Sequence, residues 1–104
     1  MARFDVYINP DKQESEPIPF FIDVQSDYIK GIETRMVMAL WDASFFKVKV
    51  ENLNPEFLLL GRRLVLDAPS LGAVPRSFLK RPVANLGTHQ MLIQDAIDML
   101  FGSY

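Results

Sequence analysis

The chain has no cysteine and only one histidine among its 104 residues. Without cysteine it can form no disulfide, no thiolate nucleophile and no cysteine-ligated zinc or iron–sulfur site. It also lacks an apolar run long enough to cross a bilayer, and its N-terminus lacks the apolar segment of a signal peptide. We therefore expect a cytoplasmic protein that does not act at a membrane.

An excess of charge of one sign is also missing. Lysine and arginine number 11 against 13 acidic residues, which gives a net charge of -2. A chain with this balance is not expected to bind nucleic acid through the phosphates alone. The apolar fraction of 49% is that of a folded protein, and the length fits one domain over residues 1–104.

Catalytic and metal-binding patterns are scarce. The histidine, His89, falls at the start of a predicted helix, where a solvated or capping role is the common one, and no G-x-S-x-G motif is present. The pairs Asp23 and Asp27, and Asp95 and Asp98, lack a third metal ligand. The five glycines are scattered and form no phosphate-binding loop. We expect no enzyme activity, no metal and no cofactor.

One enzymatic alternative stays open. A metal-free ribonuclease needs a cationic side chain to stabilise developing charge and a base to activate the ribose hydroxyl. The chain offers five arginines of the right type, which otherwise indicate solvated surface charge: Arg35, Arg62, Arg63, Arg76 and Arg81.

Strand patterns dominate the first two-thirds of the chain. Apolar residues alternate with polar ones over residues 3–8 and 20–25, which predicts two strands paired through a polar hairpin loop over residues 9–19. The nearly continuous apolar run Met36–Trp41 is typical of a strand buried on both faces. Val48 and Val50 alternate with lysines and indicate a half-exposed strand.

The later segments predict a hairpin and then a helix. Apolar stretches on either side of Gly61 indicate a β-hairpin, whereas the segment from Pro69 to Pro75 is expected to be irregular. Thr88 is a candidate N-cap for a terminal helix of roughly 13 residues. Its apolar residues recur at helical spacing: Leu92, Ile93, Ala96, Ile97, Leu100 and Phe101.

The apolar stripe of this helix is broadened by Met91 and Met99. A helix with so wide a stripe often packs on two partners, here the sheet and a second subunit that meets it near Met99 and Leu100. The order of strands first and one helix last predicts a mainly β, α+β fold, with a twisted antiparallel sheet or small barrel closed by the helix.

Several motifs resemble those of one protein family. Residues 22–27 read I-D-V-Q-S-D and are followed by R-M-V at 35–37. Weaker matches are F-D-V-Y at 4–7, G-A-V-P at 72–75, V-A-N-L at 83–86 and D-A-I-D-M-L-F at 95–101. Over nearly its whole length the sequence resembles the CcdB family, the toxins of ccd toxin–antitoxin modules.

The resemblance implies a fold and an activity. The family fold is a homodimer, and each subunit is a strongly bent antiparallel sheet of the SH3-like barrel type shared with MazF toxins. A small extra sheet and a C-terminal helix complete it. Members insert between the dimerisation parts of the DNA gyrase A subunits and trap gyrase on cleaved DNA, without bond chemistry of their own. A CcdA antitoxin neutralises the toxin and recruits it to operator DNA, so that operator DNA is reached only through the antitoxin.

Positions matching the family's gyrase contacts are Ser26, Tyr28, Ile29, Lys30, Met91, Asp95, Asp98, Gly102, Ser103 and Tyr104. The dimer interface is expected at Met99, Leu100 and Phe101. The chain departs from the pattern at its end, where Gly-Ser-Tyr replaces the Trp-Gly-Ile of the best-known gyrase poison. This change favours an alternative, a degenerate homologue that binds antitoxin but not gyrase. A MazF-like ribonuclease is the third hypothesis, after the gyrase poison and the degenerate homologue.

Overall fold

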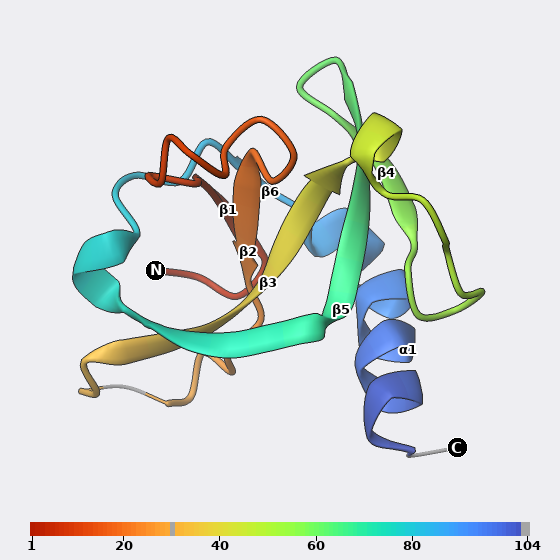
Figure 1. The fold of residues 1–104 in the computed structure, drawn as a ribbon. Helices are drawn as coiled ribbons and strands as arrows, with labels where there is room; N and C mark the ends of the chain where they lie inside the picture. The colour runs from red at the N-terminus through yellow and green to blue at the C-terminus, as the bar shows by residue number, and fades with distance from the viewer. Residues whose placement is uncertain (30, 103–104) are drawn as a thin grey trace.

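The computed structural model describes residues 1–29 and 31–102 (Figure 1). Six strands come first and one α-helix comes last, as the sequence predicts. The strands are β1 (Asp5–Ile8), β2 (Phe20–Asp23), β3 (Thr34–Asp42), β4 (Glu56–Leu59), β5 (Arg62–Pro75) and β6 (Ala84–Asn85), and the helix is α1 (Gln90–Phe101). Short 3₁₀ turns lie at Ala43–Phe45, Arg76–Phe78 and Gly87–His89.

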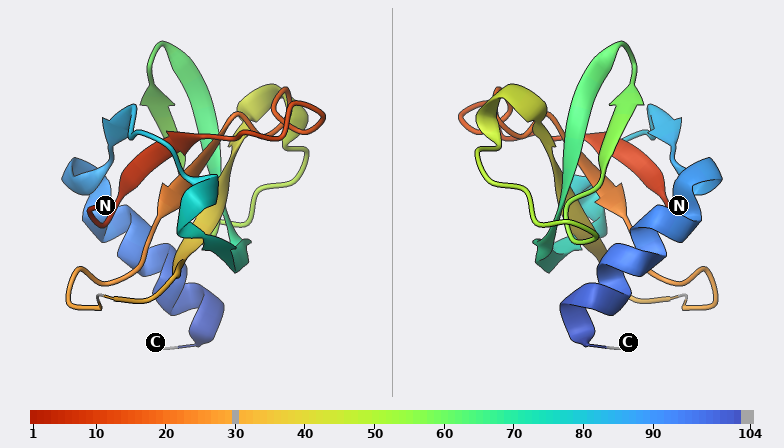
Figure 2. Two further views of the ribbon diagram at one scale, coloured as in Figure 1. Left: turned by 90° about the vertical axis from the view of Figure 1, so that its left-hand side faces the viewer. Right: turned by 90° about the vertical axis from the view of Figure 1, so that its right-hand side faces the viewer.

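The strands form one antiparallel sheet in the order β4-β5-β3-β2-β1-β6. The sheet curls into a half-barrel, and α1 lies against it (Figure 2). The bent antiparallel sheet with a terminal helix is therefore confirmed. The resemblance implies a small extra sheet beside the main one. Here the β4–β5 hairpin belongs to the main sheet, because the 14-residue strand β5 also pairs with β3.

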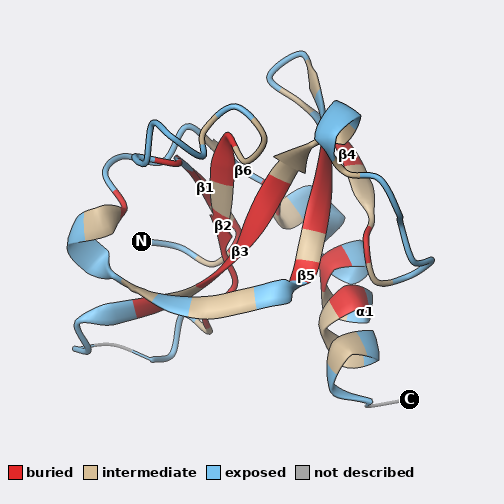
Figure 3. Cartoon of the chain, in the orientation of Figure 1, coloured by how far each residue is buried: buried red, intermediate tan, exposed pale blue. Residues whose placement is uncertain are grey.

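The period-2 alternation of the central strands explains how both faces of the sheet are covered. Val6, Ile22 and Met38 face the main core, which also contains Ile93 and Ala96 of α1. The residues next to them in sequence point to the opposite face, where Tyr7, Val37 and Leu79 form a smaller buried cluster. Buried residues thus run along β1, β2 and β3 (Figure 3), which confirms the prediction of a strand buried on both faces.

The loop between β1 and β2 is also as predicted, and one asparagine organises it. Asn9 is buried; its backbone N–H donates to the Pro19 carbonyl at 2.9 Å, and its side-chain amide donates to the Ile18 carbonyl at 2.9 Å. The two bonds close the hairpin loop beside the Ile8–Phe20 pair of the ladder. In the second hairpin, Leu60 and Gly61 have φ values of 52° and 74°, as a two-residue turn between twisted strands requires.

The predicted strand around Val48 and Val50 is wrong. Residues 46–50 have no strand structure, and Val48 is 77% exposed. Alternation is a necessary sign of a half-buried strand, but a strand also needs a neighbour that offers free backbone groups. At this point β3 is already paired with both β2 and β5, so no such neighbour is free on that strand.

The segment from Pro69 to Pro75 also differs from the prediction, because it continues β5. Only its first part departs from a regular ladder: Ala39 pairs with Asp67, and Val37 pairs with Gly72. The Ser70 hydroxyl fills the gap by accepting a hydrogen bond from the Ala39 N–H at 2.8 Å and donating to the Asp67 carbonyl at 2.6 Å. An irregularity of this kind tolerates Pro69, which has no N–H to give to a ladder.

The predicted N-cap Thr88 is wrong as well. The helix begins at Gln90 after a 3₁₀ turn, and neither Thr88 nor His89 caps it with a side chain. Asn85 stabilises the turn before the helix instead, because its side-chain oxygen accepts the Gly87 N–H at 2.7 Å. A Cβ at position 87 would lie 2.7 Å from that oxygen, so a larger residue there would displace the Asn85 side chain from this hydrogen bond.

An ion pair at the end of β3 gives a pH-dependent prediction. Asp42 accepts a hydrogen bond from Arg62 at 2.8 Å, and this bond, aided by Ser44, lowers the pKa of Asp42 to about 2 from its usual 3.8. A depressed carboxyl pKa stabilises the fold above the unfolded value and loses that effect as the pH falls toward 2. We expect Asp42→Asn to lower stability at neutral pH, and the deficit to vanish near pH 2 in urea titrations.

Glu16→Gln is the matched control, because Glu16 is exposed and makes no ion pair among the described residues. It should change stability little at any pH. A deficit of Asp42→Asn that stayed constant down to about pH 2 would contradict this account.

Candidate protein-binding surface

The segment that follows β2 is anchored by a buried carboxylate. Asp23 is fully buried and accepts two hydrogen bonds from Arg35, at 2.6 Å from Nε and 2.9 Å from Nη2. Its Oδ1 also accepts the Gln25 N–H at 3.0 Å. The hydrogen bond to Asp23 is the main cause that raises the pKa of Arg35 above its usual value. The first aspartate of I-D-V-Q-S-D, Asp23, is therefore structural.

The rest of that motif turns the chain outward. Asp27 accepts the Arg3 N–H at 2.7 Å, and the Ser26 hydroxyl oxygen accepts the Tyr28 N–H at 3.2 Å. The turn leaves the Tyr28 side chain 97% exposed and Ile29 47% exposed. Ser26 thus shapes the turn, while Tyr28 and Ile29 are exposed to solvent. Lys30, the next predicted contact, lies outside the described residues.

The second predicted contact segment is the outer face of α1. Met91 is 77% exposed, and Asp95 is also on the surface. Asp98 is half-buried and accepts a hydrogen bond from the Gln94 side-chain amide at 3.0 Å. The structure therefore places all three predicted helix residues outside the core, but it ties Asp98 to its neighbour one turn earlier.

Arg3 joins the two segments. Its Nε donates to the Val24 carbonyl at 3.1 Å, and its Nη2 donates to the Gln94 side-chain oxygen at 3.0 Å. Its guanidinium also lies 4.7 Å from the centre of the Phe4 ring. This arginine bridges the β2–β3 segment and α1, so that the two form one continuous surface. Sequence reasoning missed it, because an arginine just ahead of a strand carries no distinguishing signal.

The three predicted dimer residues lie in different surroundings. Leu100 packs against the main core of its own subunit, whereas Met99 is 41% exposed and Phe101 is 62% exposed. Residues two apart on a helix point about 200° apart, so Met99 and Phe101 occupy different flanks of α1. The Met99 flank also carries Leu92, which is 49% exposed and lies seven residues earlier.

Gly102 ends the helix. Its φ of 70° is in the left-handed region, and its N–H donates to the carbonyls of Asp98 and Met99. Glycine adopts this conformation without a steric penalty, and it is the common residue at this position. The position where the resemblance has a tryptophan anchor is thus a helix stop in this chain. Ser103 and Tyr104 lie outside the described residues.

Replacing this glycine gives a stability prediction. Gly102→Ala is expected to lower the free energy of unfolding by about 1 kcal/mol, because an alanine is strained at a positive φ. The cost arises from the backbone alone, since a Cβ there meets nothing within 4 Å. Gly72→Ala is the control, because its φ is not positive and a Cβ would meet only the Ser70 carbonyl at 3.6 Å. Equal stability of the two variants in urea titrations would contradict the account.

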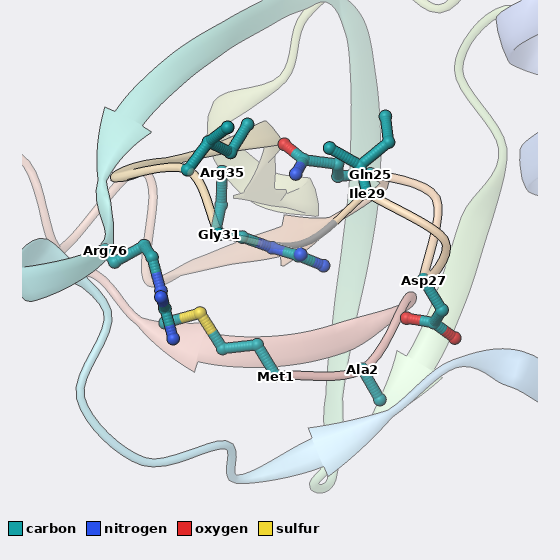
Figure 4. Close-up of a pocket in the computed structure, with 9 residues that line it drawn as sticks. Met1, Ala2, Gln25, Asp27, Ile29, Gly31, Arg35 and Arg76 are labelled. Atoms are coloured by element: carbon teal, nitrogen blue, oxygen red, sulfur yellow. The ribbon is translucent and has the colours of Figure 1, made fainter.

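The candidate ribonuclease arginines are not gathered at one place. Arg62 and Arg63 sit at the β4–β5 hairpin and pair with Asp42 and Glu56, whereas Arg35 pairs with Asp23. Arg35 and Arg76 line one cavity (Figure 4). Arg81 is not among the residues that line it.

His89 lies elsewhere, with its ring centre 5.0 Å from that of Phe57. Within residues 1–29 and 31–102 there is no group of three potential metal-ligating side chains. In the same part of the chain no helix is long and apolar enough to span a membrane.

The curled half-barrel and its terminal helix define the fold, and Tyr28 and Ile29 are exposed on the segment that follows β2. The family model described as CcdB protein matches residues 3–102. The chain belongs to the CcdB family, whose members are the toxins of ccd toxin–antitoxin modules. No curated protein matches the chain in a sequence search.

Proposed function

We propose that this protein is a toxin that binds the DNA gyrase A subunit and traps gyrase on cleaved DNA. The observation that carries the proposal is the family match over residues 3–102, in a chain whose two family-matched contact segments are bridged by Arg3. Trapping gyrase in this way requires that the toxin bind gyrase and does not require the toxin to catalyse a reaction.

The contact residues proposed on this surface fall into two groups. Tyr28 and Ile29 supply exposed apolar and aromatic area, the kind of side chain that concentrates binding energy at interfaces. Met91 adds apolar area from the helix, and Asp95 with Asp98 adds negative charge suited to an arginine-bearing surface of gyrase. Ser26 contributes through the turn that holds Tyr28 in place.

The proposal includes the assembly. The exposed Leu92 and Met99 flank of α1 would pair with a second copy in a homodimer. A CcdA-like antitoxin would bind and neutralise the dimer, and operator DNA would be reached only through the antitoxin, since the net charge of the chain is -2. The protein would act in the cytoplasm as one domain, without a cofactor.

One observation supports the second candidate, a homologue that keeps antitoxin binding but not gyrase binding. Gly102 occupies the tryptophan position and ends the helix in a left-handed conformation, so the main aromatic anchor of the known poison is missing. Two aromatic side chains stay exposed on the candidate surface among the described residues: Tyr28 in the β2–β3 segment, at 97%, and Phe101 at the end of α1, at 62%.

Growth arrest separates the two candidates. We expect induced expression to stop growth of a gyrase-sensitive strain, and a gyrase A substitution at the dimerisation-domain arginine to relieve the arrest. Arrest that persisted unchanged in the resistant strain would contradict the gyrase proposal. No arrest in either strain, together with tight binding of an antitoxin, would support the second candidate.

A further inference from the structure

A cavity of about 410 Å³ opens on the far side of the β2–β3 segment from α1. It is lined by two arginines, Arg35 and Arg76, by Gln25 and Asp27, and by apolar residues that include Met1, Ile29 and Ile32. Figure 4 shows the Arg35 guanidinium extending into it, Arg76 entering from one side, and Asp27 at the other side.

Gln25 has an unmet hydrogen-bond donor at this cavity. The residue is 6% exposed, and its side-chain oxygen accepts the Met36 N–H at 3.0 Å. That bond fixes which end of the amide is nitrogen. The nitrogen, Nε2, is buried and has no hydrogen-bond partner among the described residues. Because burying a donor without an acceptor is destabilising, such a group indicates that an acceptor is expected there.

The charges around the cavity select the kind of acceptor. Asp23 engages Nε and Nη2 of Arg35, which leaves the outer edge of that guanidinium for the cavity. Arg76 makes no ion pair among the residues that the structure describes. Asp27 on the opposite wall would repel a dianion. A single negative charge placed between the arginines, away from Asp27, is therefore favoured over a phosphate.

The rim of the cavity is apolar. Met1 is 46% exposed, Ile29 is 47% exposed and Ile32 is 44% exposed. Exposed apolar side chains beside paired cationic donors suit a ligand that carries an alkyl group next to its anion. We propose that this cavity is a binding site for a carboxylate with an adjoining apolar chain, held by Arg35 and Arg76, with Gln25 Nε2 as the amide donor.

The site does not depend on gyrase binding, since its recognition groups differ from the proposed gyrase contacts except at Ile29. Two sources have the required chemistry: a free alkyl carboxylate, and an acidic side chain next to an apolar one in a polypeptide. Both place the same oxygens between the same donors. The test therefore begins with hexanoate and then compares peptides.

The test is a titration of the ¹⁵N-labelled full chain with sodium hexanoate at constant ionic strength. We expect saturable NMR shifts at the Gln25 side-chain amide and the Met36 N–H. Hexanamide, which has the same chain without charge, should not bind. Arg76→Gln should weaken hexanoate binding about tenfold or more, because the change removes the positive charge and its hydrogen bond to the carboxylate. Arg81→Gln, an exposed arginine outside the cavity, should leave it unchanged.

The absence of a saturable shift at Gln25 would overturn the proposal, and so would equal binding of hexanoate by wild type and Arg76→Gln. Because Arg76 is exposed, we expect Arg76→Gln to fold as the wild type does, so that weaker binding reports the loss of the arginine itself. The peptides acetyl-Leu-Glu-Leu-amide and its Gln counterpart then assign the source. Preference for the Glu peptide identifies a polypeptide ligand, and binding of hexanoate alone identifies a small carboxylate.

Discussion

Arg35→Met is expected to lower the free energy of unfolding by about 3–5 kcal/mol, enough to unfold much of a protein of ordinary stability. The change leaves the Asp23 carboxylate fully buried without its two hydrogen bonds from the guanidinium. The loss of folding follows from the unpaired charge rather than from lost packing, since methionine retains most of the stem of the side chain.

Urea unfolding of three variants measures this effect. Arg35→Met should be the least stable, and Arg35→Met with Asp23→Leu should recover part of the loss, because the second change removes the unpaired charge. Arg63→Met is the matched control: its pair with Glu56 is at the surface, with the arginine side chain 71% exposed, and should cost about 0–1 kcal/mol. Similar stability of Arg35→Met and Arg63→Met would contradict the account.

Tyr28→Ala is expected to weaken binding to the gyrase A dimerisation fragment by at least about 2 kcal/mol, or roughly thirtyfold. Tyr28 is the most exposed large side chain of the described surface, at 97%, and its turn is held by Ser26 and Asp27. Since the side chain contacts solvent in the free protein, its removal should leave the stability of the fold unchanged.

Calorimetric titration checks this expectation. Leu58→Ala is the control, because Leu58 is 73% exposed on β4, at the opposite edge of the sheet from β1 and β6. It should bind as the wild type does. Equal affinity of both variants would place the gyrase contact elsewhere on the molecule.

The sheet could be predicted because the alternation of residues in its central strands shows which side chains face each side of the sheet. Val6 and Ile22 alternate with Tyr7 and Phe21, and each set faces a different buried cluster. The helix was predicted for the same reason, from the spacing of Ile93 and its apolar neighbours. In these elements the local pattern and the tertiary packing require the same residues.

The errors arose where pairing partners decide the structure. Val48 and Val50 have the alternation of a strand but pair with none, and the adjoining β3 already has two neighbours. Pro69 has the composition of a loop but lies in a strand whose irregular register accepts it. The N-cap at Thr88 failed because Asn85, outside the helix, caps the entry turn. Strand partners come from distant segments and are not encoded in a short window of sequence, whereas the Asn85–Gly87 hydrogen bond is local and was overlooked.

The candidate surface, too, could be predicted only in part from the sequence. Exposure of Tyr28 and Met91 agrees with the roles that the family resemblance implies, whereas Arg3 was not foreseen, because its three hydrogen bonds join residues 21, 24 and 91 positions apart. Only the folded chain brings these residues together. The buried role of Asp23 and Arg35 was likewise outside what the sequence shows.

The most direct test of the central claim is calorimetric titration of the full chain with the dimerisation fragment of the gyrase A subunit. The account predicts saturable binding that is lost when the fragment's dimerisation-domain arginine is replaced. Absence of binding by a folded protein that still binds a CcdA-like antitoxin would contradict it.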